Sequence, residues 1–247
     1  MISPHDLNNW SVVIPVLNEN ELLGGLLAQL QEVGELIVVD GGSSDRTCEI
    51  AALMGAQLLH SKSPNRGAQM AMGAANTSRP YLLFLHADAR LERGWCGHLA
   101  HAIMKSDVSA AAFRLEVQSP GWRLRLLEWL VYLRSMWFQL PYGDQGLALT
   151  RQKYDLVGGY LSLPLMEDLD LVQRLQKLGK LVQTPAKIKV SGRRWERLGV
   201  WRSCWRNAKL RAAWRRGVDP GLLATRYRAY QNTQRLPFGS RCQPWLE

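Results

Sequence analysis

Cysteine is scarce in this chain, and its placement excludes two ways of stabilising a small domain. Only 4 of the 247 residues are cysteine, at positions 48, 96, 204 and 242, with no C-x-x-C pair. Such spacing supports neither a structural zinc site nor a disulfide framework. The fold must therefore rest on a hydrophobic core, for which 47% hydrophobic residues are sufficient. Sparse cysteine also suits a reducing compartment, so we expect a cytoplasmic protein.

Long apolar runs are absent as well. A membrane-spanning helix needs about 18 uncharged apolar residues, and the nearest candidate, residues 126–140, is interrupted by Glu128 and Arg134. The first residues, MISPHDLNNW, contain neither the basic nor the apolar region of a signal peptide. The sequence therefore predicts no membrane span, and membrane contact would be peripheral, at the inner membrane surface.

Glycine-rich phosphate-binding loops are a third absence. A dinucleotide site needs G-x-G-x-x-G directly after the first strand, where this chain reads PVLNENELLGG over residues 15–25. The loop G-x-x-x-x-G-K-[ST] is missing too, which disfavours a nucleotidyltransferase with a glycine-rich, lysine-bearing loop. A bound pyrophosphate would then be held by side chains and a metal ion.

Apolar runs and helical patterns alternate along the first half of the chain. Strands are predicted for residues 10–16, 35–40, 56–61, 81–88 and 108–117. Helices are predicted for residues 22–30, 46–54, 65–76 and 95–104. This alternation predicts an α/β fold with a mostly parallel central sheet and helices on both faces. Residues 1–115 would form a nucleotide-binding half, and the rest continues from it without a linker.

Two of the predicted strands end on a carboxylate. Asp40 is followed directly by two glycines, and Asp88 ends the fourth strand. Ligands of open parallel sheets bind beyond the carboxyl ends of the strands, and the glycines let the backbone turn and a ligand approach closely. The alternative for residues 36–47 is a plain strand–turn–helix in which Ser44 or Asp45 caps the helix. These residues alone leave both interpretations open.

Four motifs occur in the order and spacing of family 2 glycosyltransferases. They are SVVIPVLNE, IVVDGGSSDRT, LLFLHADAR and MEDLDLVQRL, spread over residues 10–180. The chain therefore resembles this family, which has the GT-A fold. Two more segments, SPNRGAQMAMGAAN and GDQGLALTR, resemble a small bacterial subfamily associated with arsenosugar biosynthesis. The resemblance implies a GT-A catalytic domain over residues 1–190, with its acceptor half at 116–190. It also implies a nucleoside diphosphate sugar donor and a hydroxyl acceptor, either lipid-linked or a small molecule.

The resemblance also implies where the donor binds. Its nucleotide would contact Pro15, Asn18, Glu19, Asp40, Gly41 and Arg66. Asp40 would accept the imide N–H of the base, and the Arg66 guanidinium suits diphosphate oxygens. Two of these residues also have a plain interpretation, Glu19 as an acid in the first turn of a helix and Arg66 as a surface arginine.

A divalent metal ion is implied by the motif His86-Ala87-Asp88. Asp88 matches the metal-binding aspartate of the family's D-x-D motif, so Mg²⁺ or Mn²⁺ would bind there and bridge the phosphates. Histidine stands where the first acid of the motif is usual. His86 is either a metal ligand, which would favour Mn²⁺, or a hydrogen-bonding wall residue. A catalytically degenerate nucleotide-sugar or membrane-surface binding protein is therefore the alternative function.

Asp168, with Glu167 beside it, matches the catalytic base of the family. An inverting transfer needs one base to take the acceptor's proton as its oxygen attacks the anomeric carbon opposite the leaving group. From the residues alone, acids that open a helix are ordinary, and Asp170 is expected to be such an acid. Asp144 and Gln145 are candidate contacts to acceptor hydroxyls, although the glycines beside them could simply form a turn.

The C-terminal segment, residues 191–247, is basic and rich in tryptophan. Residues 193–235 contain 12 Lys/Arg and two acids. We predict a helical extension that packs on the domain with arginines outward and tryptophans inward. Contact with an anionic membrane is the alternative, and nucleic acid is not expected as a partner. A further resemblance, to an arginine–tryptophan motif of processive relatives, implies phosphate contacts for Arg193, Arg194 and Trp195.

Overall fold

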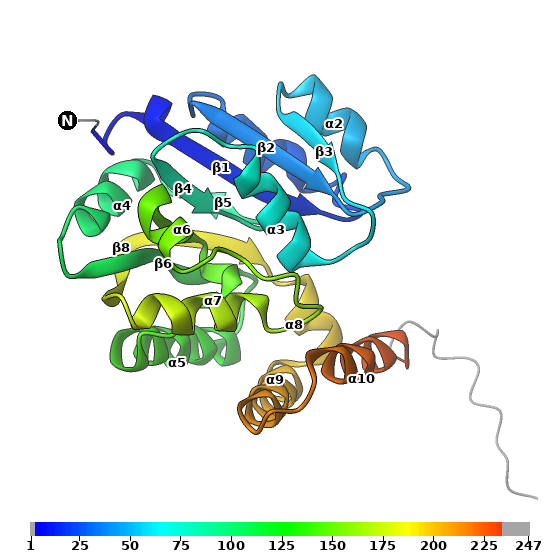
Figure 1. The fold of residues 1–247 in the computed structure, drawn as a ribbon. Coiled ribbons are helices and arrows are strands. Elements are labelled where there is room, and N and C mark those ends of the chain that lie inside the picture. The colour runs from blue at the N-terminus through cyan, green and yellow to red at the C-terminus, as the bar shows by residue number, and fades with distance from the viewer. Residues whose placement is uncertain (1–2, 234–247) are drawn as a thin grey trace, which may run out of the picture.

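An eight-stranded mixed sheet forms the centre of the structure (Figure 1). The computed structural model describes residues 3–233, apart from the side chains of residues 194, 197 and 230–233. The strands follow the order β3-β2-β1-β4-β7-β6-β8-β5 across the sheet. Their bounds are Trp10–Val16 (β1), Glu35–Asp40 (β2), Gln57–His60 (β3), Tyr81–Phe84 (β4), Arg90–Leu91 (β5), Val108–Gln118 (β6), Leu147–Thr150 (β7) and Lys180–Ser191 (β8).

Parallel pairing dominates the part of the sheet that the N-terminal half supplies. Strands β3, β2, β1 and β4 are parallel neighbours, and β6 pairs with β8 in parallel. The other three pairings, β4 with β7, β7 with β6 and β5 with β8, are antiparallel. Four of seven pairings are thus parallel, which confirms the predicted mostly parallel sheet. Val16 of β1 is the register partner of Asp40 of β2, so the loops after these strands share one edge.

The strand predicted over residues 81–88 is shorter than expected. β4 ends at Phe84, and a turn follows in which Ala89 N–H donates to the carbonyl oxygen of His86 at 3.1 Å. Leu85, Ala87 and Ala89 are nevertheless buried. The predicted end of the strand was wrong because an apolar sequence shows only that residues are buried in the core. Residues in a turn can be buried as well as residues in a strand. The turn takes Asp88 out of the hydrogen-bonded ladder.

Ten α-helices and three short 3₁₀ helices lie within the described residues. The α-helices are Leu23–Leu27 (α1), Thr47–Leu53 (α2), Arg66–Ala75 (α3), Trp95–Ile103 (α4), Trp122–Phe138 (α5), Arg151–Leu156 (α6), Glu167–Gln176 (α7), Arg193–Leu198 (α8), Val200–Arg215 (α9) and Pro220–Thr233 (α10). The 3₁₀ helices are Leu7–Asn9 (η1), Ala28–Leu30 (η2) and Gly143–Gln145 (η3). Asp45 Oδ1 accepts the Thr47 N–H at the start of α2. The N-cap position itself is Arg46, whose side chain makes no capping hydrogen bond, so the predicted cap at Ser44 or Asp45 is wrong.

Different helices cover the two faces of the sheet. One buried cluster, which includes Trp10 and Phe113, joins the sheet to α1, α2, α4 and α5. A second cluster, which includes Phe84 and Leu171, joins it to α3, α6 and α7. Burial of apolar side chains on both faces explains why the strands read as continuous hydrophobic runs. Helices on both faces were predicted, and this prediction is confirmed.

Helices α8, α9 and α10 follow β8 and extend beyond the sheet layers (Figure 1). Trp201 and Trp205 of α9 are 44% and 63% exposed. The prediction that the tryptophans of this segment point inward is therefore wrong for these two, whereas Trp195 and Trp214 are half-buried. Part of the predicted extension, residues 234–247, lies outside the described residues. No helix within residues 3–233 combines the length and apolarity needed to cross a bilayer.

Small residues let α3 lie close to the sheet, and this close approach is testable. A Cβ atom on Gly73 would lie 2.3 Å from Val13 Cγ1. Gly73→Ala should therefore push α3 off β1 and lower the free energy of unfolding by about 1–3 kcal/mol, measured by urea denaturation. The control is Gly97→Ala in α4, where a Cβ atom meets nothing within 4 Å. It should be neutral or stabilise by up to about 1 kcal/mol, and equal effects of the two variants would contradict the prediction.

Candidate active site

Charged side chains from six separate segments converge beyond the ends of β1 and β4. Each interacts electrostatically with at least one of the others. We call this group the charged cluster, and it consists of Glu19 after β1, Arg66 of α3, Asp88 after β4, Asp144 of η3, Asp168 of α7 and Arg193 of α8. Five of these segments follow a strand or open a helix, which is where the fold leaves polar groups accessible to a ligand.

Asp88 and Asp144 lie close enough for their charges to interact. Burial raises the pKa of Asp88 and the carboxylate of Asp144 raises it further, while Arg66 and Arg193 oppose the shift. Asp144 Oδ1 is buried and accepts no hydrogen bond from any described residue. Carboxylate oxygens are the ligands that Mg²⁺ and Mn²⁺ prefer. The residues present therefore fit the metal ion that the resemblance implies.

Gly143 separates two residues that the sequence singled out. A Cβ atom at this position would lie 2.1 Å from Asp168 Oδ2 and 2.9 Å from His86 Nε2. The missing side chain is what lets η3, the turn after β4 and the start of α7 approach one another. A turn was the only reason for this glycine that the sequence indicated, and the close approach is a second one. His86 points at the cluster, where it could serve as a ligand or as a wall residue.

Asp168 lies in the first turn of α7. Tyr160 donates a hydrogen bond from its hydroxyl to Asp168 Oδ1 at 3.1 Å. Burial raises the pKa of Asp168 to about 7, and the charge of Glu167 adds to the shift, whereas Arg66 and the Tyr160 hydrogen bond oppose it. Asp168 can therefore exchange a proton near neutral pH. Tyr160 was missed in the sequence because no motif marks it and its contact depends on the loop before α7.

Glu167 has a different environment from its neighbour. Its side chain is 6% exposed, and its Oε1 lies 3.7 Å from Arg66 Nη1. The pair holds the first residue of α3 against the first residue of α7. Glu167 therefore engages Arg66, whereas the carboxyl of Asp168 accepts the hydrogen bond of Tyr160.

Arg193 joins the start of α8 to the loop after β1. Its Nη2 lies 3.3 Å from Glu19 Oε2, and its Nη1 lies 3.3 Å from Glu21 Oε2. Burial raises the pKa of Glu19, and Arg193 opposes this shift. Trp195 is half-buried and packs against the hydrophobic core. The side chain of Arg194 lies outside the described residues.

Gln145 corrects one prediction from the sequence. It is fully buried, and its Oε1 accepts hydrogen bonds from Arg134 Nη2 at 2.9 Å and Ser135 Oγ at 3.0 Å. Its Nε2 donates to the carbonyl oxygen of Phe113 at 3.1 Å. The side chain thus joins α5, β6 and η3 and has no free face for a ligand. The predicted contact to an acceptor hydroxyl is wrong, because the amide satisfies polar groups of the protein itself.

The loops after β1 and β2 are tied together. Pro15 lies within β1 as the register partner of Val39. Asn18 has a left-handed backbone (φ 55°), and its Oδ1 accepts the Ser44 N–H at 2.9 Å. Glu19 N–H donates to Thr47 Oγ1 at 2.8 Å. These bonds fix the edge on which the nucleoside pocket was predicted.

Asp40 ends β2 at the same edge. It is 3% exposed and accepts the backbone N–H groups of Gly42 and Ser43 at 2.9 and 3.1 Å. These hydrogen bonds and the Ser43 side chain outweigh burial and lower the pKa of Asp40, which is therefore ionised at neutral pH. The space beside Gly41 was expected to admit a ligand, but Gln69 and Pro64 fill it, with Gln69 Nε2 3.1 Å from the Cβ position.

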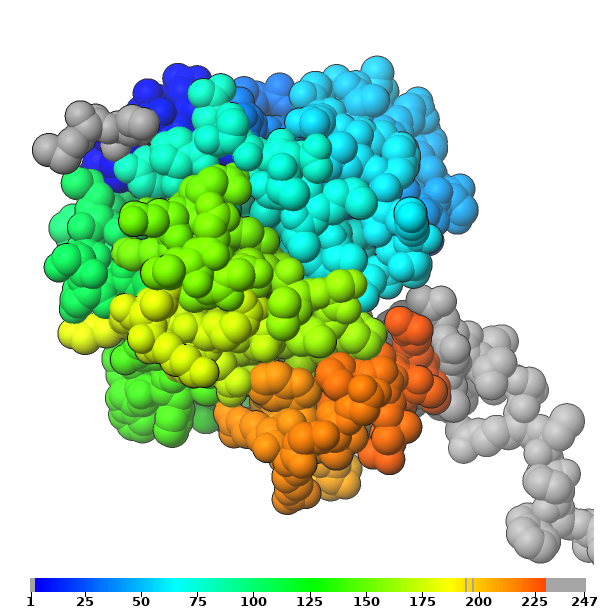
Figure 2. Space-filling view, in the orientation of Figure 1, coloured from blue at the N-terminus to red at the C-terminus, as the bar shows by residue number. Residues whose placement is uncertain are grey.

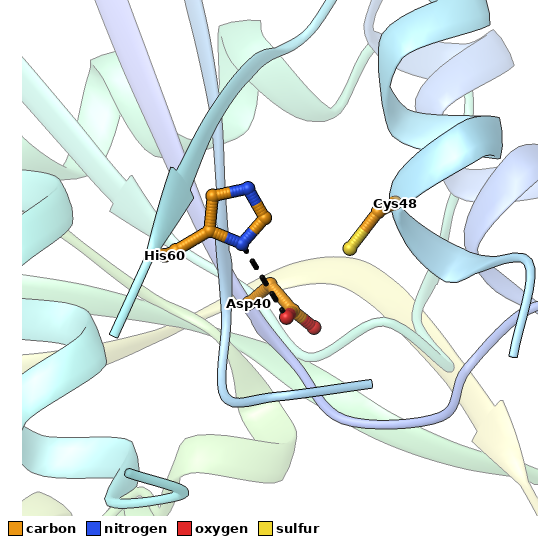
Figure 3. Close-up of side chains that lie close together, drawn as sticks. All are labelled: Asp40, Cys48 and His60. Atoms are coloured by element: carbon orange, nitrogen blue, oxygen red, sulfur yellow. Dashed lines mark ion pairs between the residues drawn. The ribbon is translucent and has the colours of Figure 1, made fainter. Parts of the chain in front are cut away.

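Cys48 and His60 accompany Asp40 (Figure 3). His60 Nδ1 lies 3.6 Å from Asp40 Oδ2, and one ligand atom from each of the three residues lies within 4.8 Å of the others. Such a thiol, imidazole and carboxylate set could hold a borderline-soft cation. Neither Cys48 nor His60 was singled out from the sequence, although His60 is the register partner of Asp40. This group is separate from the charged cluster.

A pocket of about 140 Å³ opens beside Asp168. One wall consists of Arg66, Tyr142, Glu167 and Asp168, and the other comes from α9 and α10. Figure 2 shows the orange surface of these two helices against the yellow-green surface of the segment that carries α7. The second wall contains Asn207, Leu210, Arg211 and Tyr227. The C-terminal helices therefore complete the site.

Comparison with known sequences agrees with the three motifs that lie within residues 11–162. The sequence model of Glycosyl transferase family 2 matches residues 11–162. An uncharacterized glycosyltransferase of Mycobacterium tuberculosis is 33% identical over 84 residues, which span 34% of this chain and 38% of the relative. The 4,4'-diaponeurosporenoate glycosyltransferase of Staphylococcus haemolyticus is 36% identical over 106 residues, spanning 39% of this chain and 28% of the relative. The matches thus cover less than half of each relative.

Solved structures share the fold. Glucosyl-3-phosphoglycerate synthase from Mycobacterium tuberculosis, crystallised with Mn²⁺, UDP and glucosyl-3-phosphoglycerate, superposes with a TM-score of 0.53 at 20% identity, covering 76% of this chain and 73% of that one. TarS of S. aureus superposes with a TM-score of 0.58 at 14% identity, covering 74% and 36%. The fold is that of the GT-A glycosyltransferases. With the family model matching more than half of its length, the chain belongs to glycosyltransferase family 2.

Proposed function

We propose that this chain transfers a sugar from a nucleoside diphosphate sugar to a hydroxyl acceptor, with inversion at the anomeric carbon. The observation that carries the proposal is Asp168, a carboxyl group with a pKa of about 7 beside the acid pair Asp88 and Asp144. Asp168 can then accept a proton near neutral pH, and the carboxylate oxygens of Asp88 and Asp144 are suited to a metal ion. The subfamily associated with arsenosugar biosynthesis remains a prediction.

Asp168 acts as the general base. Tyr160 occupies Oδ1 with its hydrogen bond, so Oδ2, which faces Gly143, takes the proton of the acceptor hydroxyl. As that proton leaves, the acceptor oxygen forms a bond to the anomeric carbon, and the bond from this carbon to the diphosphate oxygen breaks on the opposite face. The electron pair leaves with the nucleoside diphosphate, so no separate acid is required.

The charged cluster would hold the donor's diphosphate. Asp88 and Asp144 would bind Mg²⁺ or Mn²⁺, with His86 beside them, and the ion when bound neutralises charge on the leaving group. Arg66 and Arg193 have carboxylate partners at 3.7 and 3.3 Å. Their guanidinium groups also suit phosphate oxygens. The nucleoside would lie along Pro15, Asn18, Glu19 and Asp40, with Asp40 accepting the imide N–H of its base.

A binding protein without turnover is the second candidate, and His86 is the residue that favours it. Histidine replaces the first acid of the D-x-D motif, which could cost the site its catalytic geometry. The variant His86→Asp separates the two functions. An inert wild type that gains sugar transfer on this change would establish the degenerate protein, whereas an active wild type would exclude it.

We also propose that α5 and α9 contact an anionic membrane. Trp122, Trp129 and Met136 repeat every seven residues on α5 and are 67%, 53% and 45% exposed. This spacing places them on one face of the helix. The C-terminal segment next to them carries a large excess of Lys/Arg, and aromatic residues beside basic ones suit the surface of an anionic bilayer. The enzyme would then work at the inner membrane surface, where a lipid-linked acceptor could reach it.

Metal binding tests the acid pair. Asp88→Asn and Asp144→Asn should each weaken Mn²⁺ binding in the presence of UDP or GDP by about 10-fold or more, because a carboxylate ligand becomes neutral. The measurement is titration of free Mn²⁺ by electron paramagnetic resonance. Asp170→Asn is the control, since Asp170 belongs to the same region but pairs with Arg174. Wild-type affinity in the Asp88 variant would refute the assignment.

The pH dependence tests the base. Turnover should fall as the pH drops through about 7, because protonated Asp168 cannot accept a proton. Tyr160→Phe removes a hydrogen bond that lowers this pKa, so the acidic limb should move up by about 0.5–1 pH unit. Asp168→Asn should abolish turnover but leave nucleotide binding intact. An acidic limb of the pH–activity profile that is unchanged in the Tyr160 variant would contradict the role of this hydrogen bond in lowering the pKa of Asp168.

Vesicle binding tests the exposed face of α5. The double variant Trp122→Gln, Trp129→Gln should bind vesicles of phosphatidylglycerol and phosphatidylcholine about 10-fold more weakly in a sedimentation assay. Leu53→Gln, which changes a 76% exposed residue on α2, is the control and should bind like the wild type. An equal loss of vesicle binding in both variants, or no loss in either, would contradict membrane contact through this face of α5.

A further inference from the structure

The pocket beside Asp168 contains an arginine that the proposed mechanism does not use. Arg211 of α9 lines this pocket together with Asp168. Its guanidinium carbon lies 5.3 Å from the ring centroid of Tyr142, which Arg134 also approaches, at 3.6 Å. The pocket therefore contains a guanidinium of α9 as well as the proposed base.

Arg211 differs from the other arginines at the site. Arg66 and Arg193 pair with carboxylates, and Arg134 donates to the carbonyl oxygen of Leu140 at 3.0 Å and to Gln145 Oε1 at 2.9 Å. Among residues 3–233, no carboxylate lies within 4 Å of Arg211, and no hydrogen bond to a described residue engages its guanidinium. None of its nitrogens is among the buried polar atoms that lack a partner, so the guanidinium is accessible to a ligand in the pocket. An anionic ligand would supply the missing partner.

We infer that the acceptor carries an anionic group, a phosphate or a carboxylate, which Arg211 binds while the reacting hydroxyl lies at Asp168. Calling the bound molecule the acceptor rests on the proposed function. Arginine offers a planar fork of donors that matches both kinds of anion. Asn207 and Tyr227, which line the same wall, are polar neighbours for the rest of the molecule.

The size of the pocket limits what can enter. Its volume of about 140 Å³ admits a small hydroxylated group with its anion, and the pocket is open to solvent, so the rest of a larger molecule can stay outside. The acceptor is therefore either a small phosphorylated or carboxylated hydroxy compound, or the phosphate-bearing head of a lipid whose chains stay outside.

The experiment measures binding of defined probes to the full chain by isothermal titration calorimetry in the presence of Mn²⁺ and UDP. The probes are glycerol phosphate, glycerate, neutral glycerol, and dihexanoylphosphatidylglycerol below its micelle concentration. The proteins are the wild type, Arg211→Gln, Arg211→Lys and Arg215→Gln. Arg215 is an exposed arginine one turn further along α9 and outside the pocket, so its variant is a matched control.

An anionic probe should bind the wild type and Arg215→Gln alike, and glycerol should bind neither. Arg211→Gln should weaken that binding by about 10- to 100-fold, as loss of a charge-assisted pair requires, and Arg211→Lys should recover part of it. Preference for glycerol phosphate or glycerate identifies a water-soluble source, and preference for the lipid identifies a headgroup. Undiminished probe binding in Arg211→Gln, or no anionic probe bound by the wild type, would overturn the inference.

Mn²⁺–UDP binding is recorded on the same samples. Its absence in the wild type would instead refute the proposed function.

Discussion

Crowded carboxylates are the constraint around which the rest of this site is arranged. Burial raises the pKa of both Asp88 and Asp168, and each is raised further by an acid neighbour. Arg66 and Arg193 compensate part of this charge, yet Asp144 Oδ1 has no donor among the described residues. The protein alone therefore leaves the site short of positive charge. The metal ion of the proposed function would supply that charge when bound.

The same crowding links stability to chemistry. An unfolded aspartate loses its proton near pH 3.8, whereas Asp168 in the folded chain loses it at about 7. Between these values the folded state binds more protons, so this residue lowers the free energy of unfolding as the pH rises from about 4 to about 7. As the proposed base, Asp168 would have a pKa near neutral pH. Tyr160 and Arg66 limit the shift and keep the carboxylate available.

How far the sequence could predict this site depends on what positions each residue. Asp40 could be found because an apolar run ends directly on it, and the parallel sheet followed from alternating elements. Asp168 needed the resemblance, since acids at a helix start are ordinary. Tyr160 could not be found, because its bond to Asp168 depends on how a loop returns to α7. The prediction for Gln145 was wrong because an amide between glycines suggests an exposed turn. In the structure its side chain is buried and forms hydrogen bonds with polar groups of the protein.

The two walls of the pocket come from different parts of the fold. In the proposed function, one wall carries the base and the other selects the acceptor. The base wall is fixed by the sheet, because α7 packs in the core beneath it. The opposite wall is carried by α9, which places Asn207, Leu210 and Arg211 at helical spacing toward the pocket. Trp201 and Trp205, on the same helix, remain exposed. With the proposed function, a change in α9 would alter acceptor binding without disturbing Asp168 or the core. If α9 rests on a membrane through its tryptophans, attachment and acceptor selection are properties of one helix.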